Sequence, residues 1–194
     1  MNVLVLPPFN AAQKTVLEAG APGATFVYSD YRSATDEQIA AADVIVGNLS
    51  PKRLCRAARL QLLQLNSAGY DNYAAAETLP RGARVCCAVG AYGQAVSEHI
   101  FAMVLAMIKR LPAYHADQLS HTWSDHGPVT SLRGARVLVM GTGDIGTHFA
   151  QLCRAMGANV TGIRRSAVDA RPPFERMVTM DQLYSELPRA DVVA

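Results

Sequence analysis

The sequence predicts an α/β protein with parallel sheets and two domains. Short apolar runs alternate with helical patterns from the first residue, and a GxGxxG motif directly follows one such run at residues 141–146. Apolar runs separated by helices are typical of βαβ units, in which the strands lie parallel. The chain has 194 residues, half of them hydrophobic, which is enough to bury a sizeable core in each of two small domains.

The first predicted domain spans residues 1–94 and contains four apolar runs. The runs are continuous rather than alternating in polarity, as expected of strands that helices cover on both faces. They are NVLVL at 2–6, TFVY at 25–28, DVIVG at 43–47 and LQLLQL at 60–65. Between them, Thr35 and Gln38 fit a capping box, and Ser50 followed by Pro51 fits an N-cap with proline in the first helical position.

The second predicted domain spans residues 95–194 and begins with a long helix from Ala95 to Leu111. This helix is apolar on nearly every face, which predicts burial on all sides, between domains or between subunits. A polar segment with Pro, Gly and Ser follows it and leads into a predicted strand, RVLVM, at 136–140. The last residues, ADVVA at 190–194, have the pattern of one more strand.

The GxGxxG motif lies between the strand at 136–140 and a further apolar run, NVTGI, at 159–163. Its residues are Gly141, Thr142, Gly143, Asp144, Ile145 and Gly146. This spacing predicts a Rossmann dinucleotide-binding unit, in which the glycines permit a tight turn, a close pyrophosphate and close helix packing. The phosphates would lie on free N–H groups at the positive end of the helix. The alternative, a glycine-rich turn of an ordinary α/β protein, is disfavoured because a predicted strand flanks the motif on each side.

Arg164 follows the second of these strands, where an Asp or Glu normally bonds the adenosine ribose 2′-hydroxyl. A guanidinium there can pair bidentately with a 2′-phosphate, with Arg165 and the Ser166 hydroxyl as further donors. The sequence therefore predicts a preference for NADP(H), with NAD(H) as a possible second cofactor. In the alternative interpretation the arginines are solvated surface charges, and Arg164 stacks on the adenine without selecting a cofactor.

A small-residue loop, Ser67 to Tyr70, follows the last predicted strand of the first domain. The carboxyl ends of parallel strands are where open α/β sheets bind ligands. The main-chain N–H groups of Ala68, Gly69 and Tyr70 would form a small nest for a carboxylate. A tight turn, with Asp71 as a turn or capping residue, explains the same residues equally well.

These segments together resemble the D-isomer-specific 2-hydroxyacid dehydrogenases. The resemblance rests on GTGDIG at 141–146, NSAGYDNY at 66–73, GAYGQAVSEHIFAMVLAMIKRL at 90–111, LRGARVLVMG at 132–141 and LPRADVVA at 187–194. It implies a flavodoxin-like substrate domain followed by a Rossmann domain, reduction of 2-oxoacids to D-2-hydroxyacids, and a homodimer. It favours substrate binding by the loop at 67–70. In the family, the catalytic Arg, Glu and His come after the position that corresponds to residue 194. The resemblance therefore implies a C-terminally truncated chain that is inactive alone, and we assign no catalytic residue within it.

Composition excludes several classes of partner. With 18 Lys and Arg against 16 Asp and Glu, scattered along the chain, a nucleic-acid surface is not expected. The apolar start is too short for a signal peptide, and the longest apolar stretch, Ile100 to Ile108, is far below the ~18 residues of a membrane span. The four cysteines lack CxxC spacing and are predicted to be buried thiols of a cytoplasmic protein.

The five histidines have no zinc-binding spacing, so no metal site is expected, and His99 is predicted to pack in the core. Two hypotheses remain beside the dehydrogenase. One is a dinucleotide-sensing binding module, as in the corepressor relatives of the family. The other is an inactive truncated product that associates through the helix at 95–111.

Overall fold

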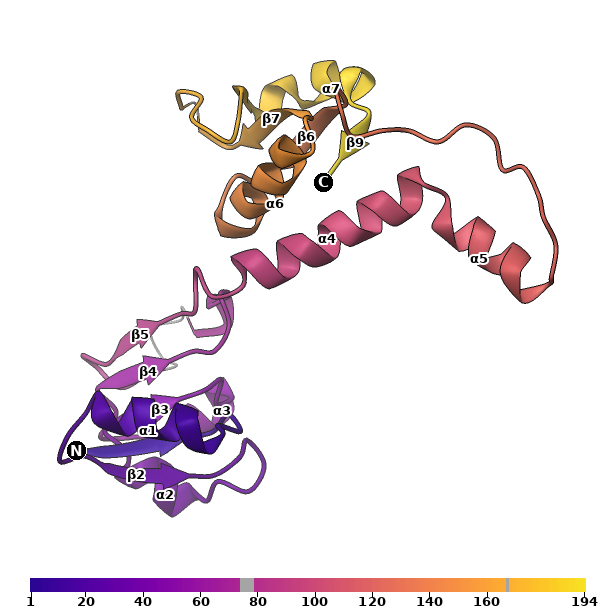
Figure 1. Cartoon of the computed structure of the whole chain (residues 1–194). Coiled ribbons are helices and arrows are strands. Elements are labelled where there is room, and N and C mark those ends of the chain that lie inside the picture. The colour runs from indigo at the N-terminus through magenta and orange to yellow at the C-terminus, as the bar shows by residue number, and fades with distance from the viewer. Residues whose placement is uncertain (74–78, 167) are drawn as a thin grey trace. The chain divides into compact units, whose positions relative to one another are not determined.

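A computed structural model describes residues 1–73, 79–166 and 168–194 of the chain. It divides into two compact units, Met1–Val89 and Gly90–Ala194 (Figure 1). The division falls ahead of Ala95, at which the second predicted domain begins. Each unit has its own parallel sheet and its own buried apolar cluster.

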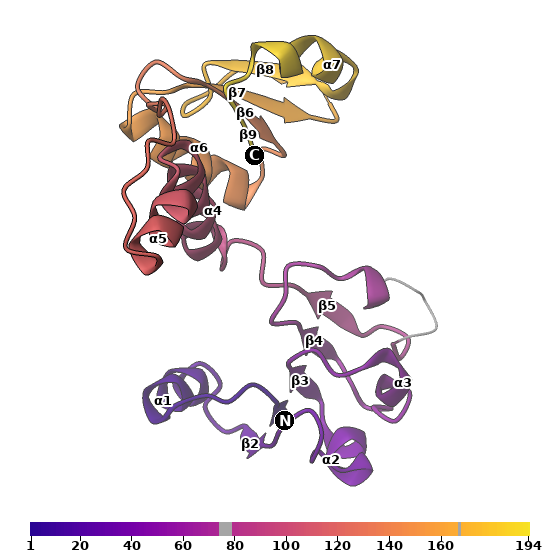
Figure 2. The ribbon, with the colours of Figure 1, turned by 90° about the vertical axis from the view of Figure 1, so that its right-hand side faces the viewer.

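The first unit is a five-stranded parallel sheet in the order β2-β1-β3-β4-β5. Its strands are β1 (Asn2–Val5), β2 (Thr25–Tyr28), β3 (Val44–Val46), β4 (Leu62–Gln64) and β5 (Arg84–Cys86). Its helices are α1 (Ala11–Ala19), α2 (Asp36–Ala41), α3 (Pro51–Leu54) and the short 3-10 helix η1 (Asp71–Tyr73). Helix α1 lies on one face of the sheet, and α2 and α3 lie on the other (Figure 2). This is the flavodoxin-like strand order, which confirms the predicted fold.

Local capping explains where two of these helices begin. Thr35 Oγ1 accepts the N–H of Gln38 at 3.3 Å and Gln38 Oε1 accepts the N–H of Thr35 at 2.9 Å, so the predicted capping box of α2 is confirmed. Pro51 opens α3 as predicted, but Ser50 makes no side-chain capping bond. Helix α1 has a capping box that the sequence analysis missed, between Asn10 and Gln13.

The second unit is a four-stranded parallel sheet in the order β8-β7-β6-β9. Its strands are β6 (Arg136–Met140), β7 (Asn159–Arg164), β8 (Arg176–Thr179) and β9 (Val192–Val193). Its helices are α4 (Gly93–Ile108), α5 (Leu111–Leu119), α6 (Asp144–Ala155), α7 (Leu183–Glu186) and the 3-10 helices η2 (Met180–Gln182) and η3 (Leu187–Arg189). The order matches the first four strands of a Rossmann sheet, as predicted.

Helix α4 packs along one face only. Ile100, Phe101 and Val104 contact the buried cluster under α6, where the Phe101 and Phe149 rings meet edge to face at 6.3 Å. Met103 and Met107 are 49% and 74% exposed, so nothing within this single chain covers the opposite face, and the predicted burial of α4 on all sides, between domains or between subunits, stays a prediction. A straight helix that packs against a single neighbouring layer buries only the residues on the face it presents to that layer, whatever the composition of its other faces.

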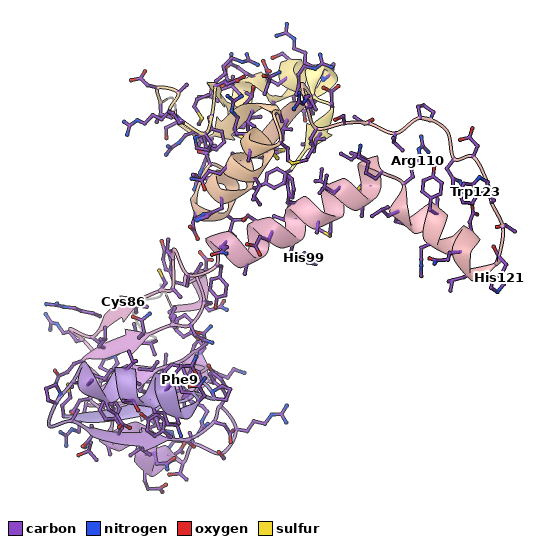
Figure 3. The ribbon with its side chains drawn as sticks, in the orientation of Figure 1. Phe9, Cys86, His99, Arg110, His121 and Trp123 are labelled. Atoms are coloured by element: carbon purple, nitrogen blue, oxygen red, sulfur yellow. The ribbon has the colours of Figure 1, made fainter. Side chains whose placement is uncertain are left out.

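Two predictions of burial are wrong. His99 is exposed on α4, away from the packed face (Figure 3). Cys55 and Cys86 are exposed and Cys87 is half-buried, so only Cys153 is the buried thiol expected, and burial raises its pKa to about 11. Cys86 ends β5, an edge strand, where one side of each residue faces solvent. No helix in the described residues is long and apolar enough to cross a membrane.

Candidate functional site

The glycine motif forms the turn between strand β6 and helix α6. Gly141 has φ +100°, which favours glycine, and its N–H donates to the carbonyl of Ile163 in β7 at 2.9 Å. A Cβ at Gly146 would overlap the carbonyl oxygen of Gly141, so helix and turn pack as closely as backbone allows. Gly143 is the N-cap of α6 and faces open space. The turn therefore presents bare backbone where the motif predicts a pyrophosphate.

The first turn of α6 supplies N–H donors to the same place. The first bond involving the cap joins Thr147 N–H to Gly143 O at 2.9 Å, so the N–H groups of Asp144, Ile145 and Gly146 have no acceptor within the helix. Unpaired donors and the helix dipole together favour an anion at this end. The Asp144 carboxylate does not compete for them, since its Oδ1 lies 3.3 Å from His148 Nδ1.

A groove of ≈ 690 Å³ runs along the carboxyl ends of β6, β7 and β8. Its lining comprises Met140, Gly141, Thr142, Gly143, Ile163, Arg164, Arg165, Ser166 and Met180. It thus brings together two groups of predicted residues, the start of the glycine motif and the arginine pair with Ser166. Asp144, Ile145 and Gly146 lie in the first turn of α6 and do not line it. The volume is within the ~300–1,000 Å³ of small-molecule and cofactor sites.

A second hollow of ≈ 290 Å³ adjoins the groove, because Thr142 and Arg164 line both. Its far wall is the β7–β8 connection, which contributes Asp169, Arg171 and Phe174. Arg171 was not predicted as a site residue, because the connection between β7 and β8 contains no recognisable motif. Arg164 therefore lies on the boundary between two cavities, with a second arginine beyond it.

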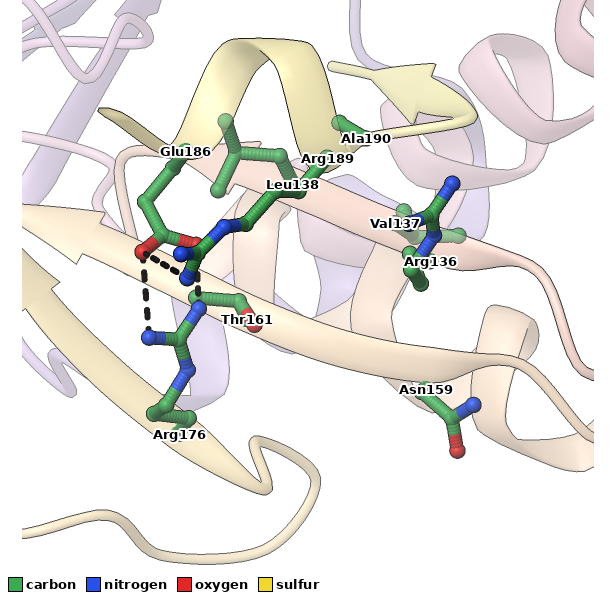
Figure 4. A pocket seen from close by; sticks show the side chains of 9 residues that line it. All are labelled: Arg136, Val137, Leu138, Asn159, Thr161, Arg176, Glu186, Arg189 and Ala190. Carbon is green, nitrogen blue, oxygen red and sulfur yellow. Dashed lines mark hydrogen bonds and ion pairs between the residues drawn. The ribbon is translucent and has the colours of Figure 1, made fainter. Parts of the chain in front are cut away.

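The arginines of the second unit differ in their partners. Ion pairs with carboxylates hold Arg136, Arg154, Arg176 and Arg189, and Figure 4 shows Glu186 between Arg176 and Arg189. Arg110 Nε donates to the carbonyl of Pro128 at 3.2 Å. Within residues 90–166 and 168–194, the side chains of Arg133, Arg164, Arg165 and Arg171 make no ion pair or hydrogen bond to another described residue. All but Arg133 line the groove or the adjoining hollow. Cations without an internal partner thus gather at this cavity.

The predicted substrate loop follows β4 at the carboxyl edge of the other sheet. Ala68, Gly69 and Tyr70 are exposed, and Tyr70 is 55% exposed. Ser67 is half-buried, and its Oγ donates to the carbonyl of Gly69 at 2.9 Å. Within the part of the chain that the structure describes, the N–H groups of Ala68 and Gly69 have no hydrogen-bond acceptor. The loop therefore has the free donors that a carboxylate nest needs.

Comparison with known proteins decides the family. The model of the D-isomer specific 2-hydroxyacid dehydrogenase NAD-binding domain matches residues 101–194. Residues 101–194 belong to this family's NAD-binding domain. A D-lactate dehydrogenase of Treponema pallidum is 29% identical over 131 residues, which cover 66% of this chain and 40% of that protein. A D-3-phosphoglycerate dehydrogenase of Mycobacterium bovis is 30% identical over 144 residues, 73% of this chain and 27% of that protein.

The likeness to a solved structure extends to both units of the chain. A D-isomer specific 2-hydroxyacid dehydrogenase family protein from Aeromonas salmonicida has a TM-score of 0.87 at 28% identity. The alignment covers 99% of this chain and 62% of that protein. This chain thus spans less than two thirds of the length of the relatives that it matches. Its Gly90–Ala194 unit contains the family's nicotinamide dinucleotide-binding segment.

Two residues that were not predicted as site residues support the sites. Gly93, which lies in the stretch at 90–111, is buried at the start of α4, and a Cβ there would overlap Asp144 Oδ1 and His148 Nδ1, so α4 lies directly against the first turns of α6. Asn48 follows β3 and bonds to the loop after β4. The signal available for Asn48 was its position just after a strand, at the carboxyl edge of the sheet. Over residues 1–73, 79–166 and 168–194, no group of three His, Cys, Asp or Glu is placed to hold a metal ion.

Proposed function

We propose that this protein is an NADP-preferring oxidoreductase that interconverts a 2-oxoacid and a D-2-hydroxyacid by hydride transfer. Family membership supports the reaction class. The observation that carries the cofactor preference is the groove in which the bare glycine turn shares one cavity with Arg164 and Arg165. Bound in that groove, the reduced nicotinamide supplies the hydride, and the residues of this chain bind and orient the cofactor.

The groove and the first turn of α6 beside it have distinct tasks in this proposal. The N–H groups of Asp144, Ile145 and Gly146 bind the pyrophosphate at the positive end of α6. Arg164 binds the 2′-phosphate bidentately, and Arg165 and the Ser166 hydroxyl add donors. These donors are free to do so because Arg164 and Arg165 have no ion-pair partner in the described chain.

The expected preference follows from the strength of one such contact. A well-made hydrogen bond to a charged group contributes ~1.5–3 kcal/mol, and solvent at this exposed rim reduces that value. Because ~1.4 kcal/mol is a factor of ten in affinity, NADPH should bind about tenfold to hundredfold more tightly than NADH. Titration of nicotinamide fluorescence measures both dissociation constants. Equal constants would refute the preference and leave the dinucleotide site intact.

The substrate carboxylate is proposed to bind the loop at 67–70. The exposed N–H groups of Ala68, Gly69 and Tyr70 are suited to an anion, whereas the Ser67 hydroxyl already donates to Gly69 and serves the loop itself. The side-chain pocket of the 2-oxoacid stays open in this proposal. The reaction class thus rests on the family, and the anion contact rests on the loop.

We also propose that the protein is a homodimer that covers the exposed face of α4. Met103 and Met107 are exposed on this helix, and Leu119 at the end of α5 and Trp123 after it are exposed as well; Trp123 is labelled in Figure 3. Large apolar side chains left exposed in this way favour association. Met107→Asp should give a folded monomer by light scattering. Val104→Asp, on the packed face, should instead unfold the unit, because an unpaired buried charge costs about 3 kcal/mol or more.

A further inference from the structure

Asn48 joins two neighbouring strands at the carboxyl edge of the first sheet. It follows β3, is half-buried, and uses both atoms of its side-chain amide on the loop after β4. Its Oδ1 accepts the N–H of Asn66 at 2.9 Å, and its Nδ2 donates to Ser67 Oγ at 2.9 Å. The opposite orientation of the amide would set two donors against each other at Asn66, so the network fixes this one.

Asn48 also fixes the direction of the hydrogen bond that the Ser67 hydroxyl makes within the loop. Because Asn48 Nδ2 can only donate, Ser67 Oγ accepts there and gives its own hydrogen to the carbonyl of Gly69 at 2.9 Å. The carbonyl of Ser67 accepts the N–H of Ala88, which follows β5, at 2.9 Å. The carbonyls of Ser67 and Gly69 are thus both occupied within the protein.

What the network leaves over is a pair of donors. The N–H groups of Ala68 and Gly69 donate no bond to Asn48, and neither has an acceptor among the described residues. Because both carbonyls are hydrogen-bonded within the protein and both N–H groups are unpaired, the loop carries a local partial positive charge. Without Asn48, Ser67 Oγ is free to rotate, and the carbonyl of Gly69 loses the bond that keeps it away from an incoming anion.

We propose that Asn48 is a positioning residue for the substrate loop, holding the N–H groups of Ala68 and Gly69 in place to bind the carboxylate of the 2-oxoacid. The inference rests on the substrate site of the proposed function. Asn48 acts through Ser67 and does not touch the substrate. Its contribution is to pre-form the nest, so that binding does not have to order it.

The test uses ¹⁵N-labelled full chain with saturating NADPH, titrated with sodium pyruvate at constant ionic strength. In the wild type, the Ala68 and Gly69 amide signals should shift and saturate. Asn48→Ala should raise the pyruvate dissociation constant by about fivefold or more, since one ordering hydrogen bond is worth that factor. The NADPH constant should stay unchanged.

Two further variants separate positioning from general stability. Ser67→Ala removes the hydroxyl through which Asn48 acts on Gly69. The double variant Asn48→Ala, Ser67→Ala should therefore bind pyruvate no more weakly than whichever single variant binds it less tightly. Asn10→Ala is the matched control: it removes the asparagine cap of α1, in the same unit, and should lower the melting temperature without changing the pyruvate constant.

The outcomes are distinct. Saturable wild-type shifts with an unchanged pyruvate constant in Asn48→Ala would overturn the role of Asn48 and leave the loop as the substrate site. The absence of shifts at Ala68 and Gly69 in the wild type would overturn both. If circular dichroism shows that Asn48→Ala does not fold, Ser67→Ala alone decides, and an unchanged constant there overturns the proposal.

Discussion

The arginines at the two ends of the second sheet differ in whether they form ion pairs within the protein. At the amino ends of the strands, Arg136 opens β6 and pairs with Asp191, and Arg176 opens β8 and pairs with Glu186. At the carboxyl end, Arg164 closes β7 and has no carboxylate partner in the described chain. The first set lies against internal anions, and the second lies beside an open groove.

The difference separates residues that stabilise the fold from residues that await a ligand. Glu186 is 5% exposed, and a buried carboxylate without a partner is costly, so Arg176 is required by the folded state. Arg164 neutralises nothing inside the protein, and its charge is useful only to an anion that arrives from solution. Substitutions at the two ends should therefore change different measured quantities.

Among the arginine substitutions at the two ends of the sheet, Arg176→Ala should lower the free energy of unfolding most. It leaves Glu186 buried with only the distant Arg189, whose Nη1 is 3.9 Å away, and should lower the free energy of unfolding by about 2 kcal/mol. NADPH affinity should stay the same. Arg164→Ala is the matched control, expected to change the free energy of unfolding by less than about 0.5 kcal/mol. Denaturant unfolding measures both, and equal losses of stability would remove the distinction between the two ends.

Arg164→Asp should produce the largest change in cofactor choice. The carboxylate repels a 2′-phosphate and accepts from a free ribose hydroxyl, so NADPH should bind more weakly and NADH more tightly. The ratio of the two constants should change by more than about tenfold, and the NADPH change should shrink in high salt. An unaltered ratio in fluorescence titrations would mean that Arg164 is ordinary surface charge.

Arg171→Ala should have a smaller effect of the same kind. Arg171 lines the hollow beside Arg164, at the solvated margin of the proposed phosphate site. An exposed charge contributes ~0.5–1 kcal/mol, so NADPH affinity should fall about threefold while NADH affinity holds. Arg133→Ala removes an arginine that is also unpaired but lies away from the groove, and it should change neither constant. Equal effects of both variants would point to net charge alone.

The Arg136–Asp191 pair should give the smallest effect, visible only as a pH dependence. Hydrogen bonds from Arg136 lower the pKa of Asp191 from 3.8 to about 2. A lowered pKa means that the pair stabilises the fold fully above pH 3.8 and loses its contribution as the pH falls toward 2. Asp191→Asn should therefore melt below the wild type at pH 6, with a gap that narrows below pH 4. A gap that is constant with pH would show that the ionised pair does not matter.

Most strands could be predicted because their apolar runs are continuous and are separated by helical patterns. β5 and β8, which begin with Arg84 and Arg176, were not predicted. Their position at the edge of a sheet does not explain this, because the edge strands β2 and β9 were predicted. The composition of α4 does not tell which of its faces meets a neighbour within the chain, so its packed face could not be predicted. Met103 and Phe101 are both apolar, yet only Phe101 packs on the core.

The candidate sites divide in the same way. Arg164 was identified because the glycine motif fixes its place in the sequence, and the structure places both on one groove. Asn48 was not, since its partner Ser67 is 19 residues away and no spacing rule joins them. Arg171 lies in a connection with no periodic pattern. A residue whose role depends on a contact between loops can be read only once strand order is known.

The absence of internal partners for Arg164, Arg165 and Arg171 has an evolutionary consequence. Proteins tolerate substitutions as long as they remain above a stability threshold, and replacing these side chains takes nothing from that margin. Single substitutions at these positions can therefore change which dinucleotide the groove accepts. Each of the resulting variants should still fold. At the opposite end of the sheet, replacing Arg176 first requires a compensating change at Glu186, so that position should drift slowly.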